Sequence, residues 1–225
     1  MFLFLILLTL VSWGIQQRLR SKFSQYAAIG LHSGLSGREI AAKMLDDHGI
    51  RDVQIISTDG QLTDNYNPTD KTVNLSADVY AGRSATAAAV AAHECGHAVQ
   101  HAQAYSFLRL RSALVPALSA VSRMMPLLLL AGVLLLRVSI IPLGLAVALF
   151  ALATLFSFIT LPVEFDASRR ALAWMDRSGV VTTAEHAVAK DALWWAAMTY
   201  VVAAVSSLAT LLYYGSMLVG GSRRN

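Results

Sequence analysis

The sequence predicts a mainly α-helical integral membrane protein, with about four transmembrane helices and a small α+β portion outside the bilayer. Three observations lead to this fold class. The 225 residues are 56% hydrophobic and only 14% charged. The mean hydropathy of +0.53 is too high for an ordinary water-soluble domain. Long uncharged apolar stretches recur along the chain, and one region of ordinary soluble composition separates the first of them from the others.

The first apolar stretch covers residues 2–15 and is followed by Arg18, Arg20 and Lys22. It lacks the basic start and the small-residue cleavage site of a typical signal peptide, so we expect an uncleaved anchor helix over residues 1–17. Fourteen helical residues span about 21 Å, whereas the bilayer core is about 30 Å thick. Trp13 and the glutamines that follow would have to reach the interface.

The region of soluble composition, residues 18–111, opens with a helix-start signal. Ser36-Gly37-Arg38-Glu39 has the spacing of a capping box, in which the serine and the glutamate each bond the other's backbone N–H. Apolar residues then recur at helical spacing up to Leu45, and Gly49 is a suitable C-terminal stop. We expect a short helix between these two signals.

Three short strands are expected next, because β-branched and apolar residues alternate with turn signals at Asp59-Gly60 and Asn67-Pro68. The expected strands cover residues 53–57, 61–66 and 72–75. Such closely spaced strands predict a small antiparallel sheet.

The segment that follows contains the pattern His-Glu-x-x-His at His93 to His97. A run of small apolar residues precedes it, with Ser84 as the expected N-cap of a buried helix. Residues four apart on a helix differ by about 40° around its axis, so His93 and His97 can both face one metal ion. Zinc suits two imidazoles and a carboxylate, with water in the fourth position. Glu94 lies beside that face and is the expected general base for attack of the water on a carbonyl.

A site of this kind needs a third ligand, and the chain has only four glutamates, Glu39, Glu94, Glu164 and Glu185. Glu164 is the natural choice, because it appears where a long apolar run ends. His101 lies about 80° from the direction of His93, which favours a surface or supporting role. Cys95 points about 200° away from His93 and is expected to pack in the core.

Two further apolar stretches, residues 112–136 and 140–163, are long enough to span a bilayer and are separated only by Arg137-Val138-Ser139. A last stretch, from residue 193 to about 220, carries aromatic residues near its ends, where membrane interfaces favour them. With the first stretch, these make four predicted spans.

A hairpin of the two middle spans returns the chain to the side that it left, so the two histidines and Glu164 are expected on one side of the membrane. Basic residues close to span ends are more numerous on that side. They are Arg18, Arg20, Lys22, Arg109, Arg111, Arg169 and Arg170, against Arg137, Arg223 and Arg224 on the other side. The positive-inside rule therefore predicts that the site faces the cytoplasm.

These residues resemble a known family. The motif His93 to His97, the segment Glu164-Phe165-Asp166-Ala167-Ser168, and the earlier Leu62-Thr63-Asp64-Asn65-Tyr66-Asn67-Pro68 with Leu75-Ser76 and Val79-Tyr80 are together similar to the bacterial YugP-type membrane zinc metallopeptidases. The similarity runs from about Gly34 to Tyr214. The pairing of the motif with a later glutamate-bearing helix is more distantly similar to the HtpX-type and Ste24-type membrane proteases.

The resemblance implies a zinc-dependent endopeptidase in the bacterial inner membrane, with one Zn²⁺ per chain. It implies His93, His97 and Glu164 as metal ligands and Glu94 as general base. The distant relatives usually have an aspartate four residues after the ligand glutamate, where this chain has Ser168. Supporting residues for the ligands are therefore left open between Ser168 and Asp166. His186, Tyr66, Tyr80 and Arg169 are candidates to stabilise the oxyanion.

The expected organisation is one domain over residues 1–225. It comprises the anchor (1–17), a zincin-like cytoplasmic portion (18–111), a transmembrane hairpin (112–163), the third-ligand segment (164–192) and a last transmembrane helix (193–220). In zinc peptidases of this build, an edge strand beside the metal helix pairs with the substrate, and Thr72–Leu75 is the candidate. The alternative left open is that this strand only covers the core.

The expected partners are a peptide or membrane-protein substrate and the lipid bilayer, without nucleic acid, and a regulatory membrane partner is left open. The rival hypothesis is a non-hydrolytic zinc-binding membrane scaffold or chaperone-like protein. A metal transporter is a weaker alternative, because the spans contain few polar ligands.

Overall fold

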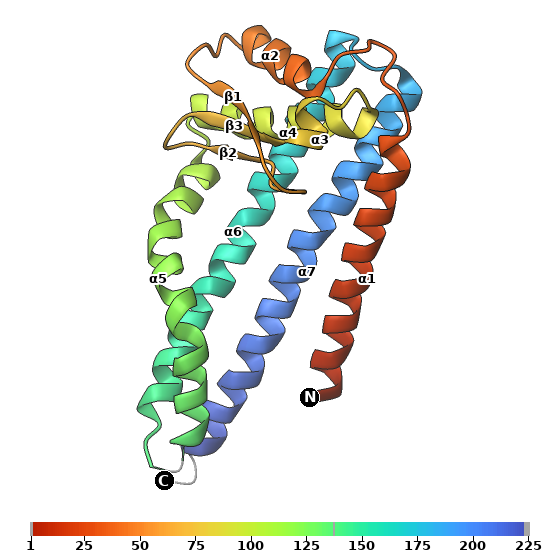
Figure 1. The fold of residues 1–225 in the computed structure, drawn as a ribbon. Coiled ribbons are helices and arrows are strands. Elements are labelled where there is room, and N and C mark those ends of the chain that lie inside the picture. Colours follow the sequence, from red (N-terminus) through yellow and green to blue (C-terminus); the bar gives the residue numbers. More distant parts are fainter. Residues whose placement is uncertain (1, 137, 223–225) are drawn as a thin grey trace. The chain divides into compact units, whose positions relative to one another are not determined.

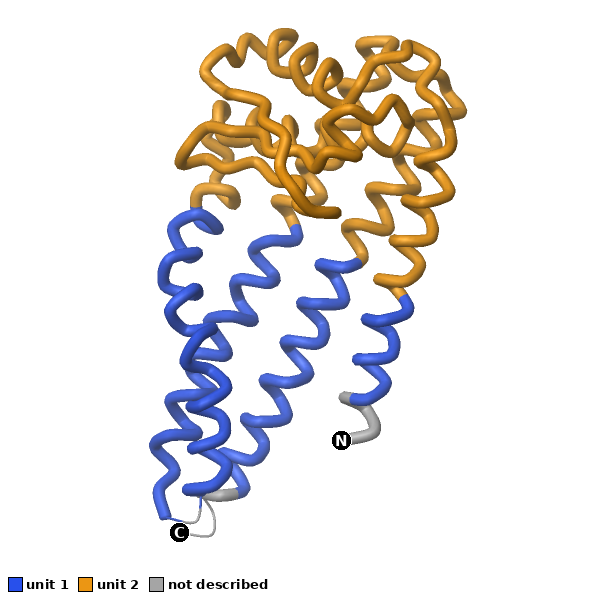
Figure 2. Tube along the Cα trace, viewed as in Figure 1, with its two compact units in different colours: residues 1–14, 110–161, 199–225 blue, residues 15–109, 162–198 orange. Residues whose placement is uncertain are grey.

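The computed structural model describes residues 2–136 and 138–222, which are mostly helical with one small sheet (Figure 1). The chain divides into two compact units, coloured separately in Figure 2. One unit contains residues 1–14, 110–161 and 199–225. The other contains residues 15–109 and 162–198, and it includes the sheet and the His-Glu-x-x-His helix.

Three helices within the described residues are long and apolar enough to cross a membrane. They are α5 (Ser106–Leu134), α6 (Ile141–Ser178) and α7 (Thr183–Ser222), whose candidate span is Thr183–Gly220. All three extend beyond the predicted apolar stretches. The helix α6 continues without a break past Val163, so Glu164 follows the apolar run on the same helix. The helix α6 therefore carries the predicted third ligand.

The first helix, α1 (Phe2–Ala27), has 26 residues and continues well beyond the apolar stretch that the sequence marks. Its C-terminal part joins the unit that contains the sheet. There Lys22 and Tyr26 contact Asp191 of α7, the first in an ion pair and the second by donating a hydrogen bond. These polar contacts hold the end of α1 against the start of α7.

The predicted capping box at the start of α2 (Gly37–Asp47) is confirmed. The hydroxyl of Ser36 accepts from the backbone N–H of Glu39, and the glutamate side chain accepts from the backbone N–H of Ser36. Gly49, just after the helix, has a φ of +70°, a left-handed conformation that glycine adopts at little cost. The short helix therefore begins and ends where the sequence predicts.

The sheet consists of β1 (Gln54–Thr58), β2 (Asn65–Asn67) and β3 (Thr72–Ser76), in the order β1-β3-β2. The prediction of an antiparallel sheet is wrong, because β1 pairs with β3 in parallel and only β2 is antiparallel to it. The prediction that Thr72–Leu75 is an edge strand is also wrong. The strand β3 takes the centre because its Val73 and Leu75 are fully buried.

The helix α4 (Ala85–Ala102) begins at the predicted N-cap, where the hydroxyl of Ser84 accepts from the backbone N–H of Ala87. A short helix, α3 (Ala77–Tyr80), lies between β3 and α4 in the sequence. Fifteen residues of α4 are buried, and seven of them are alanines, which let neighbouring elements approach closely. The core around α4 includes side chains from α2, β3, α6 and α7, namely Ile40, Met44, Val73, Leu75, Trp174, Met175 and Leu193.

Candidate metal centre

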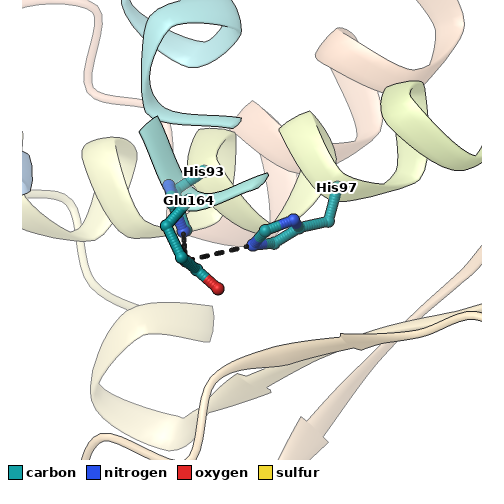
Figure 3. A group of neighbouring side chains, drawn as sticks. All are labelled: His93, His97 and Glu164. Atoms are coloured by element: carbon teal, nitrogen blue, oxygen red, sulfur yellow. Dashed lines mark hydrogen bonds and ion pairs between the residues drawn. The ribbon is translucent and has the colours of Figure 1, made fainter. Parts of the chain in front are cut away.

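Two helices bring the three predicted ligands together (Figure 3). The helix α4 presents His93 and His97 from consecutive turns, and α6 presents Glu164 opposite them. One carboxylate oxygen, Oε2 of Glu164, lies 3.2 Å from Nε2 of His93 and 3.5 Å from Nε2 of His97. Glu164 is only 2% exposed, so this convergence is built into the interior of the protein.

The donor set fits a tetrahedral zinc ion. Nitrogen and oxygen ligands lie about 2.0–2.1 Å from zinc, so two ligands of a tetrahedron are about 3.3 Å apart. The distances of 3.2 and 3.5 Å between the carboxylate oxygen and the two ring nitrogens are close to that value. One ligand atom from each of the three residues lies within 4.8 Å of the others. These three residues could hold the ion and leave a fourth position for water.

Each histidine has a partner at its other ring nitrogen. The hydroxyl of Ser168 lies 3.1 Å from Nδ1 of His93. In this chain the serine therefore contacts a predicted ligand histidine, from the position where the distant relatives usually have an aspartate. The amide oxygen Oε1 of Gln100 lies 3.0 Å from Nδ1 of His97. Both contacts leave Nε2 of the ring facing the carboxylate of Glu164.

Gln100 is the residue that the sequence analysis missed. It lies three positions after His97, which places the two side chains one turn apart on α4, and that spacing is the only sequence signal for it. Asp166, by contrast, was a candidate support. It does not contact either histidine directly, but its Oδ2 accepts a hydrogen bond from Nε2 of Gln100. Arg169 and Arg170 also pair with the Asp166 carboxylate.

Glu94, the predicted general base, is 7% exposed and lies next to His93. Burial raises the pKa of Glu94 to about 7, assisted by the negative charges of Glu164 and Asp64, while His93 and a hydrogen bond from the backbone N–H of Tyr66 oppose the rise. A carboxylate with a pKa near 7 is well suited to take up and return a proton at neutral pH.

The other predicted residues lie around this group without entering it. The hydroxyl of Tyr66, on β2, lies 2.7 Å from Nδ1 of His101, one turn beyond His97. His186, near the start of α7, contacts the backbone carbonyl of Leu172 through Nε2. That carbonyl is eight residues beyond Glu164, or about 12 Å along α6. The predicted oxyanion roles of these side chains stay predictions.

Cys95 packs in the core, as its direction on the helix predicts. Its side chain is fully buried and donates weakly to the carbonyl of Ala41, and burial raises the pKa of the thiol. A buried thiol of this kind is chemically inert.

Comparison with known proteins shows the family. The family model described as "Putative neutral zinc metallopeptidase" matches residues 1–219. The chain belongs to this family. A curated relative from Bacillus subtilis (strain 168), named "Putative membrane protease YugP", is 40% identical over 226 residues, and the match covers all of both chains. The resemblance inferred from the sequence is therefore confirmed. No solved structure matches the chain.

Membership in this family of zinc metallopeptidases implies zinc as the metal, and His93, His97 and Glu164 form the group that could hold it. The name of the relative and the three apolar helices both indicate association with a membrane.

Proposed function

We propose that this protein is a membrane-embedded zinc-dependent endopeptidase, with His93, His97 and Glu164 as metal ligands and Glu94 as general base. The observation that carries the proposal is the convergence of two Nε2 atoms and one carboxylate oxygen at 3.2 and 3.5 Å, beside a buried second carboxylate. A purely structural site has no need of an ionisable residue next to its ligands.

When bound, zinc would polarise the scissile carbonyl and lower the pKa of a water to about 7. The residues of the chain supply the remaining steps. Glu94 takes the proton from the attacking water and returns it to the leaving amine, which keeps charge from accumulating on the departing nitrogen.

The substrate would bind as an extended strand beside β2, which is an edge strand and lies next to α4. Because the hydroxyl of Tyr66 contacts His101 of α4, this part of β2 lies beside the helix that carries Glu94. An extended peptide that pairs with the open edge would pass its carbonyl groups close to Glu94. Both soluble peptides and membrane-protein segments could present such a strand.

We place the protein in the inner membrane of a bacterium, with the active site facing the cytoplasm and α1 as a fourth span. The proposal rests on the excess of basic residues near the span ends on the side of the site. The basic residues assigned to the opposite side are Arg137, Arg223 and Arg224. All three lie outside the described residues.

The test is the substitution Glu94→Gln, measured by zinc content and by hydrolysis of a fluorescently labelled unfolded protein in detergent micelles. The variant keeps the size of the side chain but cannot accept the proton. We expect about one zinc per chain and a loss of hydrolysis on the order of 100-fold or more. Glu39→Gln is the matched control, because glutamine also serves in a capping box, and it should retain both zinc and activity.

Cleavage by Glu94→Gln at the rate of the natural chain would refute the mechanism. If the natural chain binds zinc but cleaves neither the labelled protein nor a panel of membrane-protein substrates, the non-hydrolytic scaffold becomes the better hypothesis. A natural chain that takes up no zinc when the metal is supplied would contradict both the endopeptidase and the zinc-binding scaffold.

A further inference from the structure

Gln100 is fully buried, and all of its polar side-chain atoms have partners. Its Nε2 donates to the backbone carbonyl of Val163 at 2.8 Å and to Oδ2 of Asp166 at 2.9 Å. Its Oε1 faces Nδ1 of His97 at 3.0 Å. One neutral side chain on α4 therefore connects a predicted metal ligand with two acceptors on α6.

The donor and acceptor chemistry allows only one orientation of this amide. A backbone carbonyl and an ionised carboxylate can accept hydrogen bonds but cannot donate them. The NH₂ group of Gln100 must therefore face Val163 and Asp166, and its two hydrogens match the two acceptors. The amide oxygen is left facing His97, and since that oxygen only accepts, Nδ1 of His97 must carry the proton.

The contact with Gln100 thus selects one tautomer of the ring. A neutral imidazole carries a single ring proton, so a proton on Nδ1 leaves the lone pair on Nε2. That nitrogen is the one that faces Glu164 at 3.5 Å. A lone pair at this position is what a metal ion requires.

The other histidine has a partner of a different kind. The hydroxyl of Ser168 can either donate to or accept from Nδ1 of His93, because a hydroxyl rotates to suit its neighbour. Ser168 therefore permits both tautomers of His93, whereas Gln100 permits one tautomer of His97. The two ligand histidines differ in how strictly their surroundings prescribe the ring proton.

The carboxylate of Asp166 fixes the orientation of the Gln100 amide, because it accepts a hydrogen bond from the NH₂ group and would repel the amide oxygen. Arg169 and Arg170 both pair with its carboxylate, and Asp166 is buried, so the ionised form is held in place between two cations and the amide. Arg170 also donates to the side chain of Gln103, one turn beyond Gln100. The arrangement therefore extends from the surface of the unit to the ligand histidine.

We propose that Gln100 is a positioning residue, which holds His97 as the Nδ1–H tautomer and so presents Nε2 to the metal, with Asp166 fixing the orientation of the amide. The inference rests on the zinc ligands of the proposed function but not on peptide hydrolysis.

The first test uses the natural chain. Nitrogen NMR of the zinc-free protein in micelles, labelled with ¹⁵N-histidine, distinguishes protonated from unprotonated ring nitrogens. The chain has six histidines, and the signals of His97 are assigned by their loss in His97→Ala. We expect the proton on Nδ1 of His97. An unprotonated Nδ1 of His97, with the ring proton on Nε2 alone, would overturn the proposal.

The second test measures zinc affinity by competition with a coloured chelator. Gln100→Leu removes the acceptor while filling the space, and we expect zinc binding to weaken about 10- to 100-fold and the Nδ1–H preference of His97 to be lost. Gln100→Glu keeps an oxygen facing His97 but turns its second oxygen toward the acceptors of Val163 and Asp166, so it should weaken zinc binding as well. Gln54→Leu, at an exposed position of β1, is the matched control and should bind zinc normally.

The variant Gln100→Leu separates positioning from packing. If Gln100 only filled space, leucine would be tolerated, and the zinc affinity and the Nδ1–H preference of His97 would stay as in the natural chain. Unchanged zinc affinity in Gln100→Leu would refute the proposal. Zinc binding with the expected tautomer but without hydrolysis would leave it intact and contradict only the proposed function.

Discussion

The substitution Gly96→Ala tests how closely α4 and α6 must approach for the site to form. Gly96 lies within the His-Glu-x-x-His motif, and a methyl group at this position would lie 2.6 Å from the carbonyl oxygen of Ala167 and 3.2 Å from its Cα. Ordinary contacts begin near 3.4 Å, so the two backbones would have to separate by about 0.8 Å. The obstacle is backbone, and no side-chain rotation can relieve it.

The displacement would reach the proposed metal ligands directly. Ala167 follows Glu164 by three residues and precedes Ser168, so a shift of α6 moves both side chains away from His93. Overpacking costs about 1–3 kcal/mol. The higher helix propensity of alanine offsets at most about 1 kcal/mol of this destabilisation. A misplacement of about 1 Å at reacting groups can reduce a rate about 100-fold.

We therefore expect Gly96→Ala to fold with a lowered thermal midpoint, to bind zinc at least 10-fold more weakly and to lose hydrolysis about 100-fold. The assays are a circular dichroism melt in micelles, chelator competition and cleavage of the labelled protein. Gly215→Ala on α7 is the matched control, because a methyl group there meets no atom within 4 Å. Zinc affinity in Gly96→Ala within threefold of the natural chain would refute the reasoning.

Three further predictions concern the ligand set and the acid stability. Glu164→Ala should reduce zinc from about one per chain to a trace by elemental analysis, and undiminished zinc would remove Glu164 from the ligand set. Ser168→Ala should weaken zinc binding about 10-fold in chelator competition, because the Nδ1 atom of His93 loses its partner, and an unchanged affinity would show that the contact does not matter. A hydrogen bond from the indole of Trp174 lowers the pKa of Asp47, with Lys43 assisting. The ionised form of Asp47 therefore stabilises the fold above the ordinary carboxylate pKa of about 3.9, and this contribution is lost as the pH falls through the lower folded value. The difference in thermal midpoint between the natural chain and Trp174→Phe should accordingly narrow below about pH 4, and a constant difference would contradict this.

Local signals predicted the secondary structure well where they act within a few residues. The capping box at Ser36, the stop at Gly49 and the N-cap at Ser84 were each identified from the sequence and are confirmed. These features depend on side chains that bond a backbone group within one turn, so the chain carries the information locally. The apolar stretches were likewise found, although the helices extend beyond them.

The sheet illustrates where such signals end. Strand positions were predicted to within a few residues, but the order β1-β3-β2 and the parallel pairing of β1 were not. Residue preferences describe how a segment suits a strand and not which neighbour it pairs with. The hairpin of β2 and β3 could be inferred from its short turn. The position of β1 could not, because it depends on the central place of β3, whose Val73 and Leu75 are fully buried.

By itself, the sequence determined the membrane class, the family and the three residues that could hold zinc, because the spacing of two histidines on a helix and a glutamate at the end of an apolar run are properties of the chain. Only the tertiary structure decided how those residues are supported. Gln100 and Gly96 carry no distinctive sequence pattern, and their importance arises from atoms of α6 that lie more than sixty residues away. Contacts between distant segments depend on how helices pack, and packing is not encoded at any single position.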